Sequence, residues 1–204
     1  MAERILQEEF ERRGAELPGY GKERGWVEFG GVEFPEFLIT QPTYKAKLAK
    51  ARELDIEVES GLRSGAVTGD AGDVHGQYHN EVEWYRIQDL ERKTTQADGL
   101  KNGLDRAIVV PDYNVVRQAI VSLGLNLGSK VTLGSVVFVQ YGDDSEDTEE
   151  IMLVSRLDGA AQESWVSVET PLAQAIEGKE KDATVFFNVK NGERTIQVKI
   201  REIK

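Results

Sequence analysis

Two aspartates, Asp70 and Asp73, lie close together in the glycine-rich segment Gly65–Glu81, which contains no Lys or Arg. Glycines supply the backbone angles that a chain reversal needs, and Asp in such a turn accepts hydrogen bonds from nearby N–H groups. Carboxylates are also the hard oxygen ligands that Mg²⁺ prefers, and one or two of them can complete a site to which other molecules contribute. The pair is therefore suited either to cap a turn or to be delivered, as metal ligands, to a partner.

The segments on either side of this turn have apolar residues at helical spacings. The first predicted helix runs from Thr43 to about Thr68, and the second runs from about Val74 to Leu104. Each apolar stripe is narrow, so we expect a helical hairpin that mostly faces water, about 40 Å long at 1.5 Å per residue. The stripe positions are Tyr44, Leu48, Ala51, Asp55, Val58 and Leu62, then Glu83, Ile87, Leu90, Thr94, Ala97, Lys101 and Leu104.

The composition restricts the classes of function. The chain has 204 residues and a formal charge of -11, so a general basic field that would attract nucleic acid is not expected. It has no Cys, which excludes disulfides, thiolate metal sites and Cys nucleophiles. It contains no secretion signal and no apolar run of about 18 residues, so we expect a cytoplasmic protein that does not bind membranes.

The remaining segments predict an α+β fold. We expect a short helix over residues 1–13, then a turn-rich aromatic arm without regular elements that packs onto the body of the protein. Strands are predicted at 131–141, 150–157, 165–168, 184–190 and 194–202, and short helices around 115–120 and at 171–176. The expected parts are an N-terminal extension (1–37), a helical hairpin (38–110), a linker (111–130) and a C-terminal domain (131–204).

The segment VSVETPLAQAIEGKEKDATV, residues 166–185, resembles the signature of the bacterial Gre-type (GreA/GreB) transcript cleavage factors. Their FKBP-like C-terminal domain carries Ser-x-x-Ser-Pro-Ile-Ala-x-Ala-Leu-x-Gly-Lys, and Ser167, Thr170, Pro171 and Gly178 stand at matching places. Gly69–Asp73, followed by Tyr78, looks like the tip of the coiled coil in this family. The matching signature also includes Leu172, Ala173, Ala175, Ile176 and Lys179.

The resemblance implies an accessory factor, not an enzyme, that acts as a monomer on RNA polymerase. Its coiled coil would enter the secondary channel of the polymerase, where Asp70 and Asp73 would help bind a second Mg²⁺ that is shared with the polymerase active site. That metal would activate water to cleave backtracked RNA near its 3′ end. The C-terminal domain would bind the rim of the channel through Ser167, Thr170, Pro171, Leu172, Ala173 and Ile176.

Three basic residues of the second helix, Arg86, Arg92 and Lys93, would guide the extruded RNA, unless they simply form a solvated helix face. Asp73 stands where the family typically has Glu, and Val74, His75 and Gly76 replace the expected Asn-Ala-Glu. Some relatives inhibit the polymerase, so a polymerase-binding inhibitor or regulator without cleavage activity is the alternative.

Other site types fit the residues less well. His75 and His79 have the i, i+4 spacing of a zinc hydrolase, but Gly76 occupies the position of the general base. A calcium loop from Asp70 to Glu81 would place Gly72 and Val74 where oxygen ligands are needed. A peptidyl-prolyl isomerase would need convergent aromatic side chains, for which the candidates are Trp165, Phe138, Phe186 and Phe187.

Overall fold

The computed structural model describes residues 3–5, 7–18, 25–67, 76–142, 148–189 and 194–204. The chain divides into two compact units, each of which we describe by itself. The first, which we call the sheet unit, comprises residues 1–43 and 106–204, and the second, the helical unit, comprises residues 44–105. The segments 1–37 and 111–130, expected as separate parts, thus belong to the same unit as residues 131–204.

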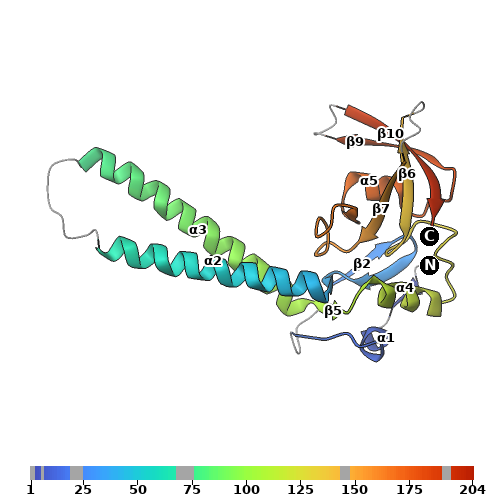
Figure 1. Cartoon of the computed structure of the whole chain (residues 1–204), viewed down its shortest axis with the longest axis horizontal. Helices are drawn as coiled ribbons and strands as arrows, with labels where there is room; N and C mark the ends of the chain where they lie inside the picture. The colour runs from blue at the N-terminus through green and yellow to red at the C-terminus, as the bar shows by residue number, and fades with distance from the viewer. Residues whose placement is uncertain (1–2, 6, 19–24, 68–75, 143–147, 190–193) are drawn as a thin grey trace. The chain divides into compact units, whose positions relative to one another are not determined.

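The sheet unit is built on a curled five-stranded sheet with the strand order β8-β7-β6-β10-β9 (Figure 1). All neighbouring strands are antiparallel except β7 and β8, which are parallel. A register shift between Ile200 and Glu202 is a bulge that bends β10 and helps the sheet to curl. The strands are β6 (Val136–Tyr141), β7 (Thr148–Val154), β8 (Trp165–Ser167), β9 (Thr184–Val189) and β10 (Arg194–Ile203).

These strands confirm the alternation seen in the sequence, but their bounds differ, and β7 covers Thr148–Val154 instead of 150–157. The first strand begins at Val136 instead of residue 131 because Thr132–Ser135 forms a turn. In this turn Ser135 N–H donates to the Thr132 carbonyl, and Gly134 takes a positive φ of 79° that favours glycine. The inward side chains of the strands form the main core, which includes Val137, Val139, Ile151, Leu153, Val198 and Ile200.

The N-terminal segment forms regular structure, and the expectation of an irregular arm was wrong. A second sheet has the order β1-β3-β2, from β1 (Glu3–Arg4), β2 (Trp26–Phe29) and β3 (Val32–Pro35), with the short helix α1 (Gln7–Arg12) between β1 and β2. Gly30 and Gly31, with φ of 62° and 83°, make the two-residue turn of the β2–β3 hairpin.

Proline does not disturb this small sheet. Pro35 is the last residue of β3 and lies beyond the two residues that pair with β1, so its missing donor falls at the strand end. Ile5, Phe10, Phe29 and Phe34 are buried in the same core as the five-stranded sheet. The expected packing of this segment onto the body of the protein is therefore confirmed.

A parallel pair of strands joins the segments before and after the helical unit. It consists of β4 (Leu38–Thr40) and β5 (Ile108–Val110), all of whose residues are buried. The predicted helix that follows is α4 (Tyr113–Ser122), and Asp112 caps it by accepting from the N–H groups of Asn114 and Val115. The strands β4 and β5 were not predicted.

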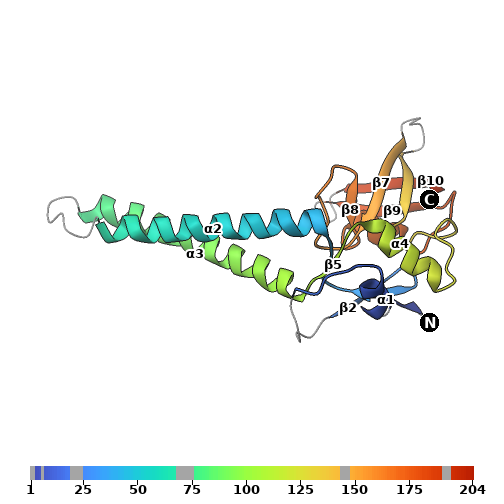
Figure 2. The same ribbon diagram turned by 60° about the horizontal axis from the view of Figure 1, so that its bottom comes forward.

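The helical unit contains most of α2 (Gln41–Val67) and α3 (Gly76–Arg106), whose ends lie within two residues of the prediction. The helices lie side by side and run antiparallel (Figures 1 and 2). In the described part of the chain no helix is long and apolar enough to cross a membrane. The apolar side chains buried in the described part of this unit are Ala51, Leu54, Ala97 and Leu104.

Candidate functional site

The signature segment folds into a capped single-turn helix, α5 (Pro171–Ile176), as predicted. Thr170 Oγ1 accepts from Ala173 N–H at 3.3 Å and donates to the Ser167 carbonyl at 2.9 Å. Pro171 occupies the first turn, where its missing N–H costs no hydrogen bond. Gly178 follows with a φ of 64°, which lets the chain leave the helix. The Thr-Pro pair and the glycine thus define the helix ends.

The six signature residues that were expected to contact a polymerase differ in their exposure to solvent. Leu172, Ala173 and Ile176 belong to the core, where α5 packs against β9, so their side chains stabilise the fold. Ser167 and Thr170 are half-buried and make the cap contacts. The exposed side chains of this surface, which we call the α5 surface, are Glu169, Pro171 and Gln174.

A buried polar cluster lies at the start of α2, and the sequence did not predict it. The carboxylate of Asp158, which is fully buried, accepts from Thr40 N–H at 2.9 Å and from Thr40 Oγ1 at 2.8 Å. Tyr113 OH donates to Asp158 at 3.2 Å and accepts from Ser155 N–H at 2.6 Å. Burial raises the pKa of Tyr113 well above its ordinary value, and the Asp158 charge adds to this rise.

This cluster holds the start of α2 against the segment around Asp158, and it is too deeply buried to bind a substrate. A negative charge beside the first turn of a helix is stabilised by the helix dipole, and Asp158 is bonded to Thr40, directly before α2. Thr43 Oγ1 joins the cluster through Thr40 Oγ1 at 2.9 Å. In the sequence, Asp158 precedes Gly159 after a strand, which is also the pattern of an ordinary exposed turn. Only the fold brings it to Thr40 and Tyr113.

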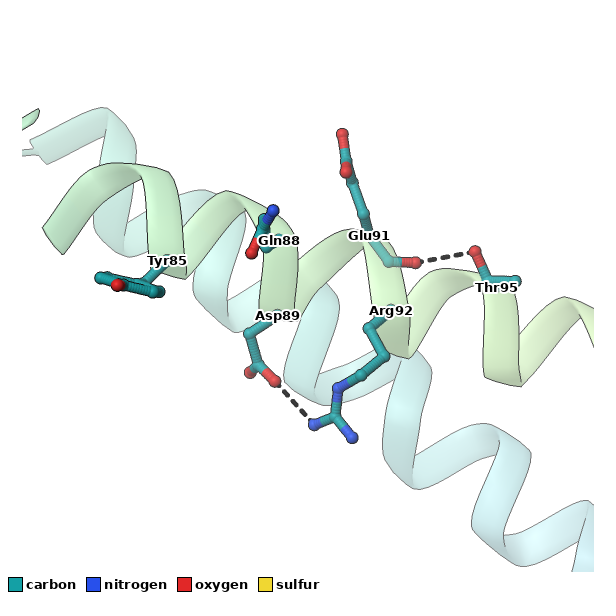
Figure 3. A pocket seen from close by; sticks show the side chains of 6 residues that line it. All are labelled: Tyr85, Gln88, Asp89, Glu91, Arg92 and Thr95. Carbon is teal, nitrogen blue, oxygen red and sulfur yellow. Dashed lines mark hydrogen bonds and ion pairs between the residues drawn. The ribbon is translucent and has the colours of Figure 1, made fainter. Parts of the chain in front are cut away.

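The three basic residues expected to guide RNA all form ion pairs on α3. Arg86 contacts Glu83 and donates to the Gly61 carbonyl on α2 at 2.7 Å. Arg92 pairs with Asp89 at 2.7 Å, as Figure 3 shows. Hydrogen bonds from Arg92 and, second, from Lys93 lower the pKa of Asp89. The guanidinium groups are therefore partly neutralised.

The third base, Lys93, joins the two helices. It lies 2.9 Å from Glu57 on α2 and 3.0 Å from Asp89. The hydrogen bond to Glu57 is the main reason why the pKa of Lys93 is raised. These contacts favour a role in holding the helices together, and a role in RNA guidance stays a prediction.

An apolar groove lies between α2 and α3, and we call it the distal groove. Val58 and Leu62 on α2 face Ile87 and Leu90 on α3 across a volume of about 490 Å³. Leu62 is 60% exposed and Ile87 is 45% exposed, so the groove is open to solvent. Gly61 leaves room for the Leu90 side chain here, because a Cβ at this position would lie 2.5 Å from Leu90 Cδ2 unless that side chain moved. The polar residues that line the distal groove are Arg86, Glu91, Thr94 and Thr95.

The tip residues Asp70, Asp73 and His75 lie outside the described residues, as does the side chain of His79. The proposed magnesium ligands and the zinc and calcium alternatives therefore stay predictions. Within the described ranges, no group of three His, Cys, Asp or Glu side chains is arranged to hold a metal ion.

The aromatic residues weighed for an isomerase pocket contact separate neighbours. Trp165 packs edge-on against Tyr113 with ring centroids 5.4 Å apart, and the Lys204 ammonium lies 4.4 Å from the Phe138 ring centroid. Phe186 is 62% exposed, and Phe187 follows it in β9 and therefore points to the opposite face. These contacts do not favour a convergent aromatic pocket.

One known family matches the C-terminal part of the sheet unit. The family described as "Transcription elongation factor, GreA/GreB, C-term" matches residues 126–204. The C-terminal part of this chain is therefore similar to the C-terminal domain of the GreA/GreB family. The GreA/GreB region contains β6 to β10 and α5, including the capped signature helix. The β2–β3 hairpin and α1 precede the matched region, although they share its core.

Solved structures of GreA/GreB relatives cover most of this chain at low identity. GreA factor homolog 1 of Thermus thermophilus has 16% identity and a TM-score of 0.32, with 82% of this chain and 97% of that chain covered. The GreA factor homolog 1 protein of Thermus aquaticus has 15% identity and a TM-score of 0.33, with coverage of 81% and 96%. The GreA/GreB factor of Nitrosomonas europaea has 19% identity and a TM-score of 0.33, with coverage of 82% and 98%. No curated protein matches the chain.

Proposed function

We propose that this protein is a transcription elongation factor that binds RNA polymerase and stimulates the cleavage of backtracked RNA by the polymerase. The observation that carries the proposal is the GreA/GreB match over residues 126–204, which includes the signature helix α5. The sheet of this region would be FKBP-like, and α2 and α3 would act as a coiled coil. We expect the protein to act in the bacterial cytoplasm as a monomer.

The exposed part of the signature is the proposed contact with the polymerase. Because Leu172, Ala173 and Ile176 are buried, a partner would meet Pro171 and its exposed neighbours Glu169 and Gln174. A Glu169→Arg, Gln174→Arg double variant should therefore weaken polymerase binding at least tenfold, because interfaces tolerate unmatched charge poorly. Glu163→Arg is a matched control, since Glu163 is exposed and lies outside the signature. Equal binding by the double variant and the control would refute this contact.

The chemistry would be supplied by Asp70 and Asp73 together with the polymerase. Their carboxylates would help to hold a Mg²⁺ ion at the polymerase active site, because one or two carboxylates can complete a site to which other molecules contribute. When bound, such an ion would supply Lewis-acid activation of the attacking water. The protein would bind no metal by itself and would hydrolyse nothing alone. The extruded RNA 3′ end would be an indirect partner, guided along Arg86, Arg92 and Lys93.

The deciding experiment uses a backtracked elongation complex with Mg²⁺. We expect the wild-type protein to shorten the transcript, and an Asp70→Asn, Asp73→Asn variant to bind the polymerase normally but to lose at least about a hundredfold in cleavage rate. A Glu53→Gln, Glu59→Gln variant removes two charges from the exposed surface of α2 and serves as the control. Cleavage by the Asn variant at the wild-type rate would refute the assignment of the two aspartates.

The second candidate is a polymerase-binding inhibitor without cleavage activity. It is favoured by one feature of the sequence, the shorter Asp73 where a longer Glu is typical of the family. The same assay separates the two functions. If the wild-type protein binds the polymerase, slows RNA extension and leaves backtracked transcripts intact, then the inhibitory function is correct.

A further inference from the structure

The two halves of the helical unit differ in how they close the seam between α2 and α3. Ala51 and Leu54 are buried with Ala97 and Leu104, so this part of the seam is filled by the chain itself. Nearer the end of α2 and the start of α3, the same seam continues as the distal groove, where Leu62 and Ile87 stay largely exposed. Exposed apolar side chains gathered in one groove, and not scattered singly, are typical of an interaction site.

The cations along this groove are already matched by acids. Arg86 pairs with Glu83, and Lys101 pairs with Asp55 at 2.7 Å. The hydrogen bond that Lys101 donates to Asp55 is the main cause that raises the pKa of Lys101, and the charge of Asp98 contributes to the same rise. The basic groups near the groove therefore leave no excess of positive charge.

Two acidic side chains that form no ion pair among the described residues remain on the α3 side, Glu91 and Asp98. Glu91 lines the groove and forms no ion pair in the described part of the chain. Figure 3 shows its side chain extending away from α3, apart from Asp89 and Arg92. Asp98 lies seven residues further on and is exposed, so it is on the same helical face as Glu91. The groove is thus apolar at its centre and acidic along this rim.

We propose that the distal groove binds an amphipathic α-helix of a partner protein, with apolar residues on one face and Lys or Arg beside them. The apolar residues would enter between Leu62 and Ile87, in the helix-in-groove mode of recognition. The basic residues would meet Glu91 and Asp98. This inference goes beyond the proposed function and does not depend on cleavage or on the α5 surface.

The probe is a fluorescent peptide of about 16 residues, roughly four helical turns, with Leu at i, i+3, i+4 and i+7 and Lys at flanking positions. Binding to the full-length protein is measured by fluorescence anisotropy. A Leu62→Ser, Ile87→Ser variant should bind the peptide at least about tenfold more weakly, because it removes the apolar centre of the groove. Ile56→Ser is the matched control, since Ile56 is 68% exposed on α2 but does not line the groove.

The charge requirement is tested separately. A Glu91→Lys, Asp98→Lys variant should weaken binding about fivefold or more at low salt and much less at high salt. A peptide with Glu in place of Lys should bind the wild-type protein weakly. Circular dichroism of every variant must show the wild-type helix content.

Three results would overturn the proposal. They are wild-type affinity in a folded Leu62→Ser, Ile87→Ser variant, an equal loss in the Ile56→Ser control, and equal binding of the Lys and Glu peptides. The first two would show that the peptide does not use this groove. The third would show that the acidic rim does not favour a basic peptide over an acidic one.

Discussion

The sheet unit and the helical unit shield their apolar side chains from water to very different degrees. The sheet unit has one continuous core that extends in sequence from Ile5 to Ile203 and joins both ends of the chain. In the described part of the helical unit, the buried apolar side chains are limited to one short seam. The sheet unit therefore depends on apolar burial, which is the dominant stabilising contribution in folding.

The helical unit depends more on interactions along and between its two helices. Ion pairs link α2 with α3 at Glu57–Lys93 and Asp55–Lys101, and others follow the i, i+3 and i, i+4 spacing within one helix. Such exposed pairs contribute little individually and weaken in salt. We infer that the helical unit opens at a lower free energy than the sheet unit. The first prediction below compares the two units directly, and the others measure single contributions to the stability of one unit.

The largest expected effect is the loss of a core side chain from the sheet unit. Ile200 is fully buried, so Ile200→Ala should lower the free energy of unfolding by about 3 kcal/mol through lost burial and a cavity. Leu62→Ala in the helical unit, at a mostly exposed position, should cost less than about 0.5 kcal/mol. Urea unfolding measures both values, and similar losses in the two variants would contradict the comparison.

A slightly smaller effect is expected in the polar cluster. Asp158→Ala would leave the buried N–H of Thr40 and the hydroxyl of Tyr113 without their acceptor, which should cost about 2 to 3 kcal/mol. Asp158→Asn keeps one acceptor oxygen and should cost less. Thermal unfolding followed by tryptophan fluorescence tests this order, with the exposed Glu163→Ala as a neutral control. If both Asp158 variants behave like that control, the cluster contributes nothing to stability.

The cap of α5 should have a moderate effect. Thr170→Ala removes the side-chain acceptor for Ala173 N–H and should cost about 1 kcal/mol. Thr170→Ser keeps a hydroxyl and should restore most of this loss, as measured by chemical denaturation. A Ser variant as unstable as the Ala variant would show that the methyl group, and not the cap, is important.

The smallest effect is expected for the ion pair between the helices. The hydrogen bond from Lys93 lowers the pKa of Glu57. Its stabilising effect should therefore be present above the ordinary Glu pKa of about 4.3 and be lost as the pH falls through the lower pKa of the folded state. At about pH 7 and low salt, Glu57→Gln should slightly lower the midpoint temperature at which the helices unfold. At about 1 M salt the substitution should have no effect. Circular dichroism measures this, and a salt-independent loss would contradict it.

The periodic parts of the fold could be predicted from the sequence, because their patterns are local. Apolar spacing was sufficient to place α2, α3 and the strands of the five-stranded sheet, and Thr170 with Pro171 marked α5. The β2–β3 hairpin was missed because its segment was interpreted as a turn-rich arm without regular elements, although Gly30 and Gly31, with positive φ, are what a tight hairpin turn needs.

The parts that depend on tertiary contact could not be predicted. Nothing near Asp158 in the sequence indicates Thr40 or Tyr113, and β4 and β5 are too short to have a period. The signature resemblance identified the α5 residues, but only the fold separates the buried Leu172 and Ile176 from the exposed Pro171. The prediction for Asp70 and Asp73 lies outside the described residues and awaits the cleavage assay.

The parallel pairing of β4 with β5 makes residues 44–105 an insertion in a continuous module. Leu38 pairs with Ile108 and Thr40 pairs with Val110, so the chain departs and returns on adjacent strands. A crossover of about a dozen residues is enough to connect two parallel neighbours. The length of the inserted helices can therefore change without any change in the strands β4 and β5 or in the module that carries them.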